Sequence, residues 1–349
     1  MTDITILGAG IFGLSIAWAC QKKGARVRVI DPGGPGAGAS GGIVGALAPH
    51  TPDNWNDKKA FQFESLLMAR AFWAEVEAAS GLSAGYARIG RLQPIDTERA
   101  LELSQGRIEK AAEFWQGQAV WNVLEAKSAP FDAAFLPATP TGFLAHDTLS
   151  ARVHPRRACA ALAAAIISQG GEVVTEGHFA GKVVHATGVA GLADLSAGLG
   201  KQAGNGVKGQ GALVNLSATT MPQISAEGLH IVPHADGTTA IGSTSETTFS
   251  DPYSTDQLLE DVIARARRVL PALEGAEVIE RWAGLRPRPA TRARSPILGE
   301  HPVHDGQFIA NGGFKIGFGM APKVGEVMAD LMLDGHDRVP QIFRPEALL

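Results

Sequence analysis

Cysteine is scarce in this sequence. Cys20 and Cys159 are the two cysteines in 349 residues, and neither belongs to a CxxC pair or to a Cys/His cluster with zinc-site spacing. The scarcity argues against a disulfide framework and against a structural metal, so the sequence predicts no metal ligand. A reducing cytoplasm suits such a composition.

Long hydrophobic runs are also missing. The longest apolar stretch, residues 158–167, is about half of the roughly 20 residues that a membrane-spanning helix needs. The N-terminus lacks the basic, apolar and small-residue regions of an export signal, because a strand pattern already begins at residue 4. We therefore expect a cytoplasmic protein without a membrane span.

Neither sign of charge dominates. Charged residues make up 19% of the chain and the net charge is −4, which argues against general attraction to nucleic acid or acidic membranes. No repeat of fixed period and no low-complexity tail is visible. With 45% hydrophobic residues and 42 glycines, the sequence indicates a globular protein with many tight turns or close backbone approaches to a ligand.

A glycine motif lies close to the N-terminus. Residues 4–7 read as a buried strand, and Gly8, Gly10 and Gly13 follow with GxGxxG spacing at the start of a predicted helix. Such spacing lets the backbone approach a pyrophosphate at the helix N-terminus. Asp31 ends the next strand and can accept hydrogen bonds from ribose hydroxyls. The sequence thus predicts a complete βαβ unit that binds a dinucleotide.

A second GxGxxG match, residues 204–209, lacks this context. No clear strand precedes it, and a strand pattern follows where a helix would be required, so we reject it as a nucleotide loop. Three features favour FAD over NAD. They are the small-residue loop at 36–50, the strand ending in small residues at 182–188, and the lack of a second credible dinucleotide unit.

Hydrophobic periodicity outlines the rest of the chain. Amphipathic helices are predicted at 60–80 and 98–115, another begins at Pro155, and a last helix begins at Pro322. Residues 211–248 are rich in strand and hairpin patterns. Because parallel-type strands occur near both ends while hairpins occupy the middle, we expect two interleaved domains.

These motifs together resemble a known family. The N-terminal unit, "GASGG" (38–42), "ATG" (186–188), "WAGLRP" (282–287) and residues 311–332 are similar to the D-amino acid oxidase family of FAD enzymes, especially glycine oxidase and monomeric sarcosine oxidase. The resemblance covers about half of the chain, namely residues 1–50, 150–212 and 281–335. Residues 51–145 and 213–280 match only loosely, as its substrate domain would.

The resemblance implies an α/β fold in which a Rossmann-like FAD-binding domain is interleaved with an α+β substrate domain built on an antiparallel sheet. The FAD-binding domain would comprise residues 1–50, 146–212 and 281–349, and the substrate-binding domain 51–145 and 213–280. FAD would be noncovalent, since residues 290–301 hold no cysteine. The implied cofactor-binding residues are Gly8, Gly10, Ile11, Phe12, Gly13, Asp31, Pro32, Ala39, Ser40, Gly41, Gly45, Val174, Ala186, Thr187, Gly188, Gly313, Lys315, Ile316 and Gly317.

The family oxidises the C–N bond of a small amino acid or N-alkyl glycine to an imine, which water hydrolyses to an oxo acid; oxygen or another acceptor reoxidises the flavin. Arg286 matches the arginine that holds the substrate carboxylate in glycine oxidase. Lys315 matches a lysine of sarcosine oxidase, at a position where glycine oxidase has arginine. His230 stands where glycine oxidase has a tyrosine, and His50 ends a loop of the match. These four are the candidate catalytic residues, and the expected partner is a small-molecule amine or amino acid.

Two departures from the family pattern keep alternatives open. Only residues 175–181 separate two strands between which the family usually has a longer β-meander. Four arginines, at positions 286, 288, 292 and 294, crowd one segment that is either a solvated loop or a phosphate or RNA contact. One alternative is FAD-dependent removal of a carboxymethyl group from modified tRNA uridine, an activity known in the same family. The other is a catalytically silent flavin-binding protein.

Overall fold

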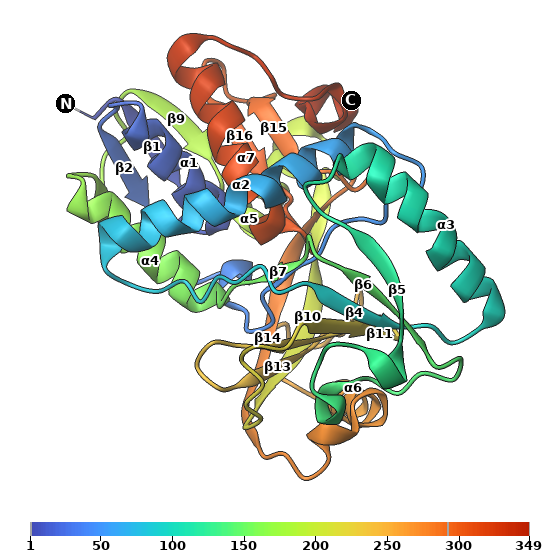
Figure 1. Ribbon diagram of the computed structural model, residues 1–349. Helices are drawn as coiled ribbons and strands as arrows, with labels where there is room; N and C mark the ends of the chain where they lie inside the picture. Colours follow the sequence, from blue (N-terminus) through green and yellow to red (C-terminus); the bar gives the residue numbers. More distant parts are fainter. Residues whose placement is uncertain (1, 292, 349) are drawn as a thin grey trace.

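Two large sheets organise the computed structural model, which describes residues 2–291 and 293–348 (Figure 1). The first sheet is parallel except for its edge strand β15, which runs antiparallel to β16. Its spatial order is β15 (Ile297–Glu300), β16 (Phe308–Asn311), β9 (Lys182–His185), β1 (Ile4–Leu7), β2 (Val27–Ile30) and β8 (Glu172–Val174).

The second sheet is antiparallel apart from the pair β4 and β11, which run parallel. Its spatial order is β14 (Val278–Pro289), β10 (Gly204–Val214), β13 (Thr239–Gly242), β12 (Leu229–Pro233), β11 (Gln223–Ala226), β4 (Arg91–Pro94), β6 (Phe143–Asp147) and β5 (Trp121–Glu125). A small third sheet pairs β3 (Ala46–Leu47) with β7 (Ala151–Arg152). The expected fold class, an α/β fold with a second sheet that is largely antiparallel, is confirmed.

The helices cover both sheets (Figure 1). α1 and α7 pack together against one face of the first sheet, α5 packs on its other face and on β10 and β14, and α6 covers the second sheet. α2 packs on α7 and α4. Their bounds are α1 Ile11–Lys22, α2 Asp57–Ser80, α3 Glu98–Trp115, α4 Pro155–Ser168, α5 Gly188–Leu199, α6 Gln257–Val269 and α7 Gly317–Ala329.

The last helix begins earlier than the sequence predicts. α7 starts at Gly317 with Ile316 as N-cap, and Pro322 lies inside it rather than at its start. Proline is common in the first turn of a helix, which explains the error, whereas Pro322 lies further inside, where a proline removes one backbone hydrogen bond and crowds the carbonyl four residues earlier. The amide of Met320 already donates to the carbonyl of Ile316 at 3.1 Å, so the first turn closes before the proline. The N-terminus of α7 therefore adjoins Lys315.

The chain passes repeatedly between the two sheets. β1 and β2, then β8 and β9, and finally β15 and β16 build the first sheet, while β4 to β6 and β10 to β14 build the second. β10 and β14 pair along most of their length within the second sheet. The domain boundaries given above stay a prediction. Within the described residues, no helix combines the length and the apolar character required to cross a bilayer.

Candidate active site

The glycine motif forms a tight turn between β1 and α1. Gly8 has φ +105°, and a Cβ there would collide with the carbonyl of Ala186, while a Cβ at Gly13 would collide with the carbonyl of Gly8. Ser40 accepts a hydrogen bond from the amide of Ile11 at 2.9 Å. The first turn of α1 has neither an acidic residue nor a side-chain cap. Its amides are therefore suited to an anionic group.

Asp31 anchors the rim of this turn. Its two carboxylate oxygens accept hydrogen bonds from the amides of Ala9 (2.7 Å) and Gly33 (2.9 Å), and each oxygen keeps a further lone pair. The amide of Asp31 donates to the carbonyl of Val174 at 3.0 Å. The structure thus brings Asp31, Val174 and the glycine turn together. Pro32 follows on the exposed side.

The loop between β16 and α7 approaches the same turn. A Cβ at Gly313 would lie 3.0 Å from the ring of Phe12, and one at Gly317 would lie 3.5 Å from the side chain of Ile11. On the opposite side, Ala186 at the end of β9 donates its amide to Leu7. Thr187 and Gly188 follow at the start of α5. Ala39 and Gly41 form a short 3₁₀ turn around Ser40. Gly45 packs on the carbonyl of Val153.

Polar residues of the candidate site lie on one face of the second sheet. In the strand registers, one residue from each of five strands faces the same way: Arg286, Gly211, Gly242, His230 and Arg91. The glycines of this face leave room for the loop after β2. A Cβ at Gly242 would collide with Val44, and one at Gly209 would collide with the guanidinium of Arg286. The last glycine of the second GxGxxG match, Gly209, therefore makes room for Arg286 within strand β10.

A cavity of about 230 Å³ opens between this face and the first sheet's loops. His50, Gln62, Arg91, His230 and Lys315 line it, together with Ser225, Ile316 and Gly319. They come from the loop after β3, from α2, from three strands of the second sheet, from the loop before α7 and from α7 itself. Three of the four candidate catalytic residues therefore share one cavity.

The two histidines of the cavity are held in the neutral form. Burial, followed by the charges of Arg91 and Lys315, lowers the pKa of His230 to about 4. Burial also lowers the pKa of His50, although its ring contact with Gln62 acts in the opposite direction. The Nδ1 atom of His230 is buried and has no hydrogen-bond partner among the described residues. It can therefore pair with a bound molecule.

Arg286 does not line this cavity but lies beside it. Its guanidinium donates to Ser243 Oγ at 2.8 Å and to the carbonyls of Lys208 and Thr244. Burial lowers its pKa to about 10, so it stays charged at neutral pH. The Arg286 Cζ and Lys315 Nζ atoms lie 5.8 and 5.7 Å from the ring centre of Phe314. Neither cation forms an ion pair within the part of the chain that is described.

Arg91 was missed by sequence reasoning. It is buried in β4, where its Nε donates to Asp147 at 2.8 Å, while its Nη2 has no partner among residues 2–291 and 293–348. Asp147 also accepts from the amide and hydroxyl of Ser150. A basic residue within a short strand was the one available signal. Gln62, on α2, was missed as well. Helical periodicity does not show whether this polar residue lies on the buried or the exposed face of the helix.

The remaining arginines of the 286–294 segment do not join the cavity. Arg288 donates to Asn205 at 3.2 Å, and Arg294 is exposed. Arg292 lies outside the described residues. Burial, followed by the charges of Arg286 and Arg294, lowers the pKa of Lys315.

Comparison with known proteins decides the family. Residues 3–331 match the model of the DAO family, described as FAD dependent oxidoreductase. The chain belongs to this family. It is 27% identical over 360 residues to glycine oxidase of Geobacillus kaustophilus, covering 95% of this chain and 92% of that protein. The glycine oxidase of Pseudomonas putida is also 27% identical, and 99% of each chain is covered.

Solved structures of DAO-type enzymes share the fold. The glycine oxidase of G. kaustophilus superposes with a TM-score of 0.82 at 24% identity, over 98% of this chain and 97% of that one. Iminodiacetate oxidase from Chelativorans sp. gives 0.84 at 22% identity, over 98% and 99%. The protein is an FAD-dependent oxidoreductase.

The residues of this chain fit FAD. The tight glycine turn leads into the N-terminus of α1, whose first turn holds no acidic residue, as the binding of a pyrophosphate requires. The N-terminus of α7 likewise has neither a side-chain cap nor an acidic residue in its first turn. Its partial positive charge adjoins Lys315 at the rim of the cavity.

Proposed function

We propose that this protein oxidises the C–N bond of a small amino acid or N-alkyl glycine, of the glycine, sarcosine or D-amino acid type. The product would be an imine that water hydrolyses to an oxo acid, with oxygen or another acceptor reoxidising the flavin. When bound, FAD supplies the electron acceptor for this oxidation. The implied cofactor contacts run along the glycine turn, Asp31, the 39–45 loop, residues 186–188 and the loop before α7.

The single observation that carries the proposal is the pair of cations around Phe314. Arg286 and Lys315 come from different sheets, yet both lie within 6 Å of one ring. Burial, followed by the charge of Arg286, lowers the pKa of Lys315, so the two cations repel each other, and neither forms an ion pair among the described side chains. A substrate carboxylate would supply the missing negative charge, and arginine can hold it bidentately.

The cavity also suits the amine of such a substrate. His50 and His230 are neutral at neutral pH because burial lowers their pKa values, so they add no positive charge beside an amine. A neutral imidazole nitrogen can accept a hydrogen bond from an amine N–H. We assign Arg286 and Lys315 to carboxylate binding and the two histidines to orientation of the amine, with Arg91 as an additional donor.

Anaerobic mixing with single substrates tests the proposal. Glycine, sarcosine or a D-amino acid should bleach the visible absorbance of the flavin, whereas glycinamide should not, because it lacks the carboxylate. Failure of every carboxylated substrate, even at high concentration, would refute the reaction. Bleaching by the amide as readily as by glycine would refute the role of the cations.

Substitutions of the two cations, with a control on the same strand, separate an effect on substrate binding from an effect on folding. Replacing Lys315, which is exposed, with methionine should raise KM by about 10- to 100-fold, as the loss of a charge-assisted hydrogen bond of about 1.5–3 kcal/mol would do. Arg286→Lys should act in the same direction. Arg281→Gln is the matched control, because Arg281 lies on the same strand but pairs with Glu260 at the surface.

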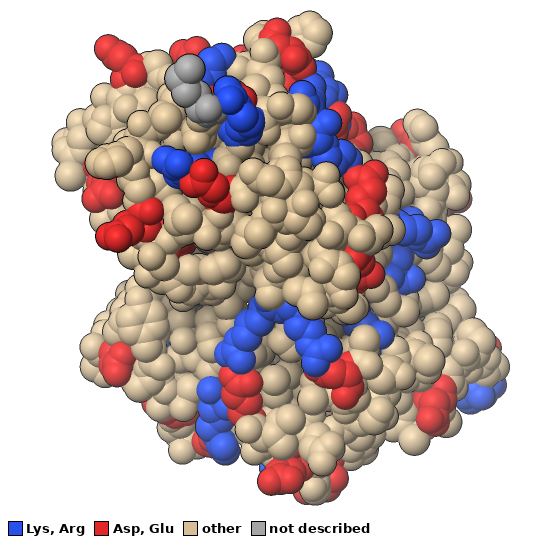
Figure 2. Space-filling model, turned by 90° about the vertical axis from the view of Figure 1, so that its left-hand side faces the viewer, with Lys and Arg blue, Asp and Glu red and all other residues tan. Residues whose placement is uncertain are grey.

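The tRNA alternative gains no support from the surface. On the face drawn in Figure 2, Lys and Arg side chains alternate with Asp and Glu. In the 286–294 segment, Arg286 is turned inward and Arg288 is engaged with Asn205. Retention of tRNA that is lost in Arg294→Glu would revive this alternative. Bound FAD that no amine reduces would instead indicate a silent flavin protein.

A further inference from the structure

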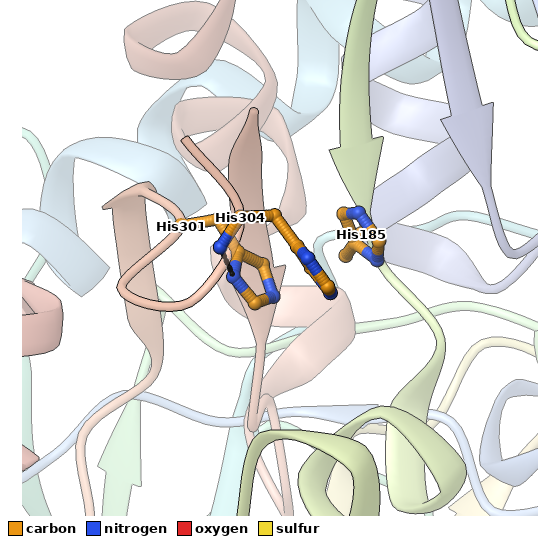
Figure 3. A group of neighbouring side chains, drawn as sticks. All are labelled: His185, His301 and His304. Atoms are coloured by element: carbon orange, nitrogen blue, oxygen red, sulfur yellow. Dashed lines mark hydrogen bonds between the residues drawn. The ribbon is translucent and has the colours of Figure 1, made fainter. Parts of the chain in front are cut away.

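Three histidines meet away from the proposed active site (Figure 3). His185 is the last residue of β9, and His301 and His304 belong to the turn between β15 and β16. One nitrogen from each ring lies within 4.8 Å of the other two. The ring centres are 4.7 Å (185–301), 5.2 Å (185–304) and 4.5 Å (301–304) apart.

The fold itself brings these rings together. In the register of β9 and β16, His185 pairs with Ile309, which packs beneath α5 rather than beneath α1 and α7. His185 therefore points to the α5 face of the first sheet, where the short turn after β15 also projects (Figure 3). Spacing along the chain could not reveal the whole group, because His185 lies on a strand that is distant in sequence from the turn that holds His301 and His304.

The spacing of the rings suits a tetrahedral metal ion. Bonds of about 2.0–2.1 Å from zinc to each imidazole place the ligand nitrogens about 3.4 Å apart, a distance that small ring rotations would reach from the present arrangement. His304 is exposed, so an ion and a water molecule as fourth ligand have access from solvent.

The surroundings of the rings also fix which nitrogens face the ion. His185 Nε2 lies 2.6 Å from Gln307 Oε1, and this partner leaves Nδ1 free as a ligand. His301 Nδ1 accepts the amides of Val303 (3.2 Å) and His304 (3.1 Å), which leaves Nε2. Coordination through Nε2 moves the proton of this neutral ring to Nδ1, and this costs the two hydrogen bonds from the turn amides.

The chemistry of three imidazole rings limits which ions suit the group. A neutral imidazole is the form that binds metal. Imidazole sets favour zinc and its neighbours among the divalent transition metals over magnesium or calcium, which prefer oxygen ligands.

We propose that His185, His301 and His304 form a Zn²⁺ site that is separate from the flavin cavity. The ion ties the end of β9 to the β15–β16 turn. The next residues after His185 are Ala186, Thr187 and Gly188, which begin α5 beside the glycine turn. Metal occupancy therefore stabilises the sheet edge from which the cofactor loops extend. This zinc site is independent of which substrate the enzyme oxidises.

Metal titration of the flavin-containing protein tests the site, after removal of any affinity tag and treatment with a chelator. Calorimetry with Zn²⁺ should show one ion per chain, and Co²⁺ should give the intense visible bands of a four-coordinate site. His304→Ala should weaken Zn²⁺ binding by about 100-fold, and Gln307→Leu by about 10-fold through loss of the ring's support. His336→Ala, an exposed histidine elsewhere, is the matched control.

Thermal unfolding gives a second readout that is independent of turnover. Zn²⁺ should raise the Tm of the wild-type protein and of His336→Ala, but not that of His304→Ala. Equal affinity of the wild type and His304→Ala would overturn the proposal. So would the weak Co²⁺ spectrum of a six-coordinate ion, or a Zn²⁺ effect on Tm that survives in His304→Ala.

Discussion

The two large sheets present their ligand-facing regions in different ways. The loops of the first sheet offer backbone amides around glycines, and at Gly8 and Gly13 a single added carbon would collide with another backbone carbonyl. The matching face of the second sheet offers polar side chains, with the charged Arg91 and Arg286 and the neutral His230 projecting from three strands. Backbone donors suit a cofactor of constant shape, whereas side chains can change with the substrate while the sheet stays intact.

The contrast extends to what stabilises each region. Close backbone packing holds the glycine turn, and its ionisable residue Asp31 is satisfied by amides. The second sheet instead buries the ion pair of Arg91 and Asp147, whose exposed side-chain fractions are 7% and 1%. A buried pair is costly to break, because one charge is left without its partner. The two sheets should therefore respond to different kinds of substitution.

The largest effect is expected in the second sheet. Asp147→Asn leaves the Arg91 guanidinium without a counter-charge and should lower the free energy of unfolding by about 3–5 kcal/mol. Chemical denaturation measures this loss. The double variant Arg91→Met, Asp147→Leu should recover most of it, and an equally unstable double variant would show that the pair is not the cause.

A slightly smaller effect is expected in the first sheet. Gly13→Ala places a methyl group against the carbonyl of Gly8 and should cost about 3 kcal/mol, since a backbone collision is relieved only by moving β1 or α1. Thermal unfolding and flavin content report the change. Gly106→Ala is the control, since its added carbon meets no atom within 4 Å. Equal stability of the two variants would contradict close packing of the turn.

A pH effect is expected where the loop after β2 meets the second sheet. His234 is buried with its Nε2 2.9 Å from the carbonyl of Ile43, and burial lowers its pKa to about 4 from 6.5. Between pH 6.5 and 4 the unfolded chain binds this proton and the folded protein does not, so the stability falls as the pH falls. His234→Gln should flatten this dependence by up to about 1.4 kcal/mol per pH unit. An unchanged slope in urea titrations would exclude His234 as its source.

The smallest change in stability, below about 1 kcal/mol, is expected for Gly10→Ala. Gly10 has an ordinary extended conformation, and a Cβ there would lie 3.3 Å from Ser40 Oγ. The fold should therefore persist while retention of FAD falls about tenfold, as measured by equilibrium dialysis. Full flavin affinity in this variant would mean that the cofactor does not pass over Gly10.

The same contrast explains how much was readable from the sequence. The β1–α1–β2 unit and Asp31 lie within about 30 neighbouring residues, so glycine spacing and strand periodicity identify them directly. The cavity assembles His50, Gln62, Arg91, His230 and Lys315 from five distant segments. Family resemblance supplied His50, His230 and Lys315, but Arg91 and Gln62 required the strand registers and the packing of α2. The start of α7 was misplaced because Pro322 imitates a helix-start signal.

The repeated passage of the chain between the sheets has a consequence for biosynthesis. β1 and β2 pair with β9 and β8, so they cannot find all of their neighbours until residues 172–185 have emerged from the ribosome, and β9 in turn lacks its neighbour β16 until residues 308–311 have followed. During translation the apolar strands beside the glycine turn therefore remain unpaired and exposed to solvent. Nascent chains of this protein are thus expected to need chaperone protection until the late strands arrive.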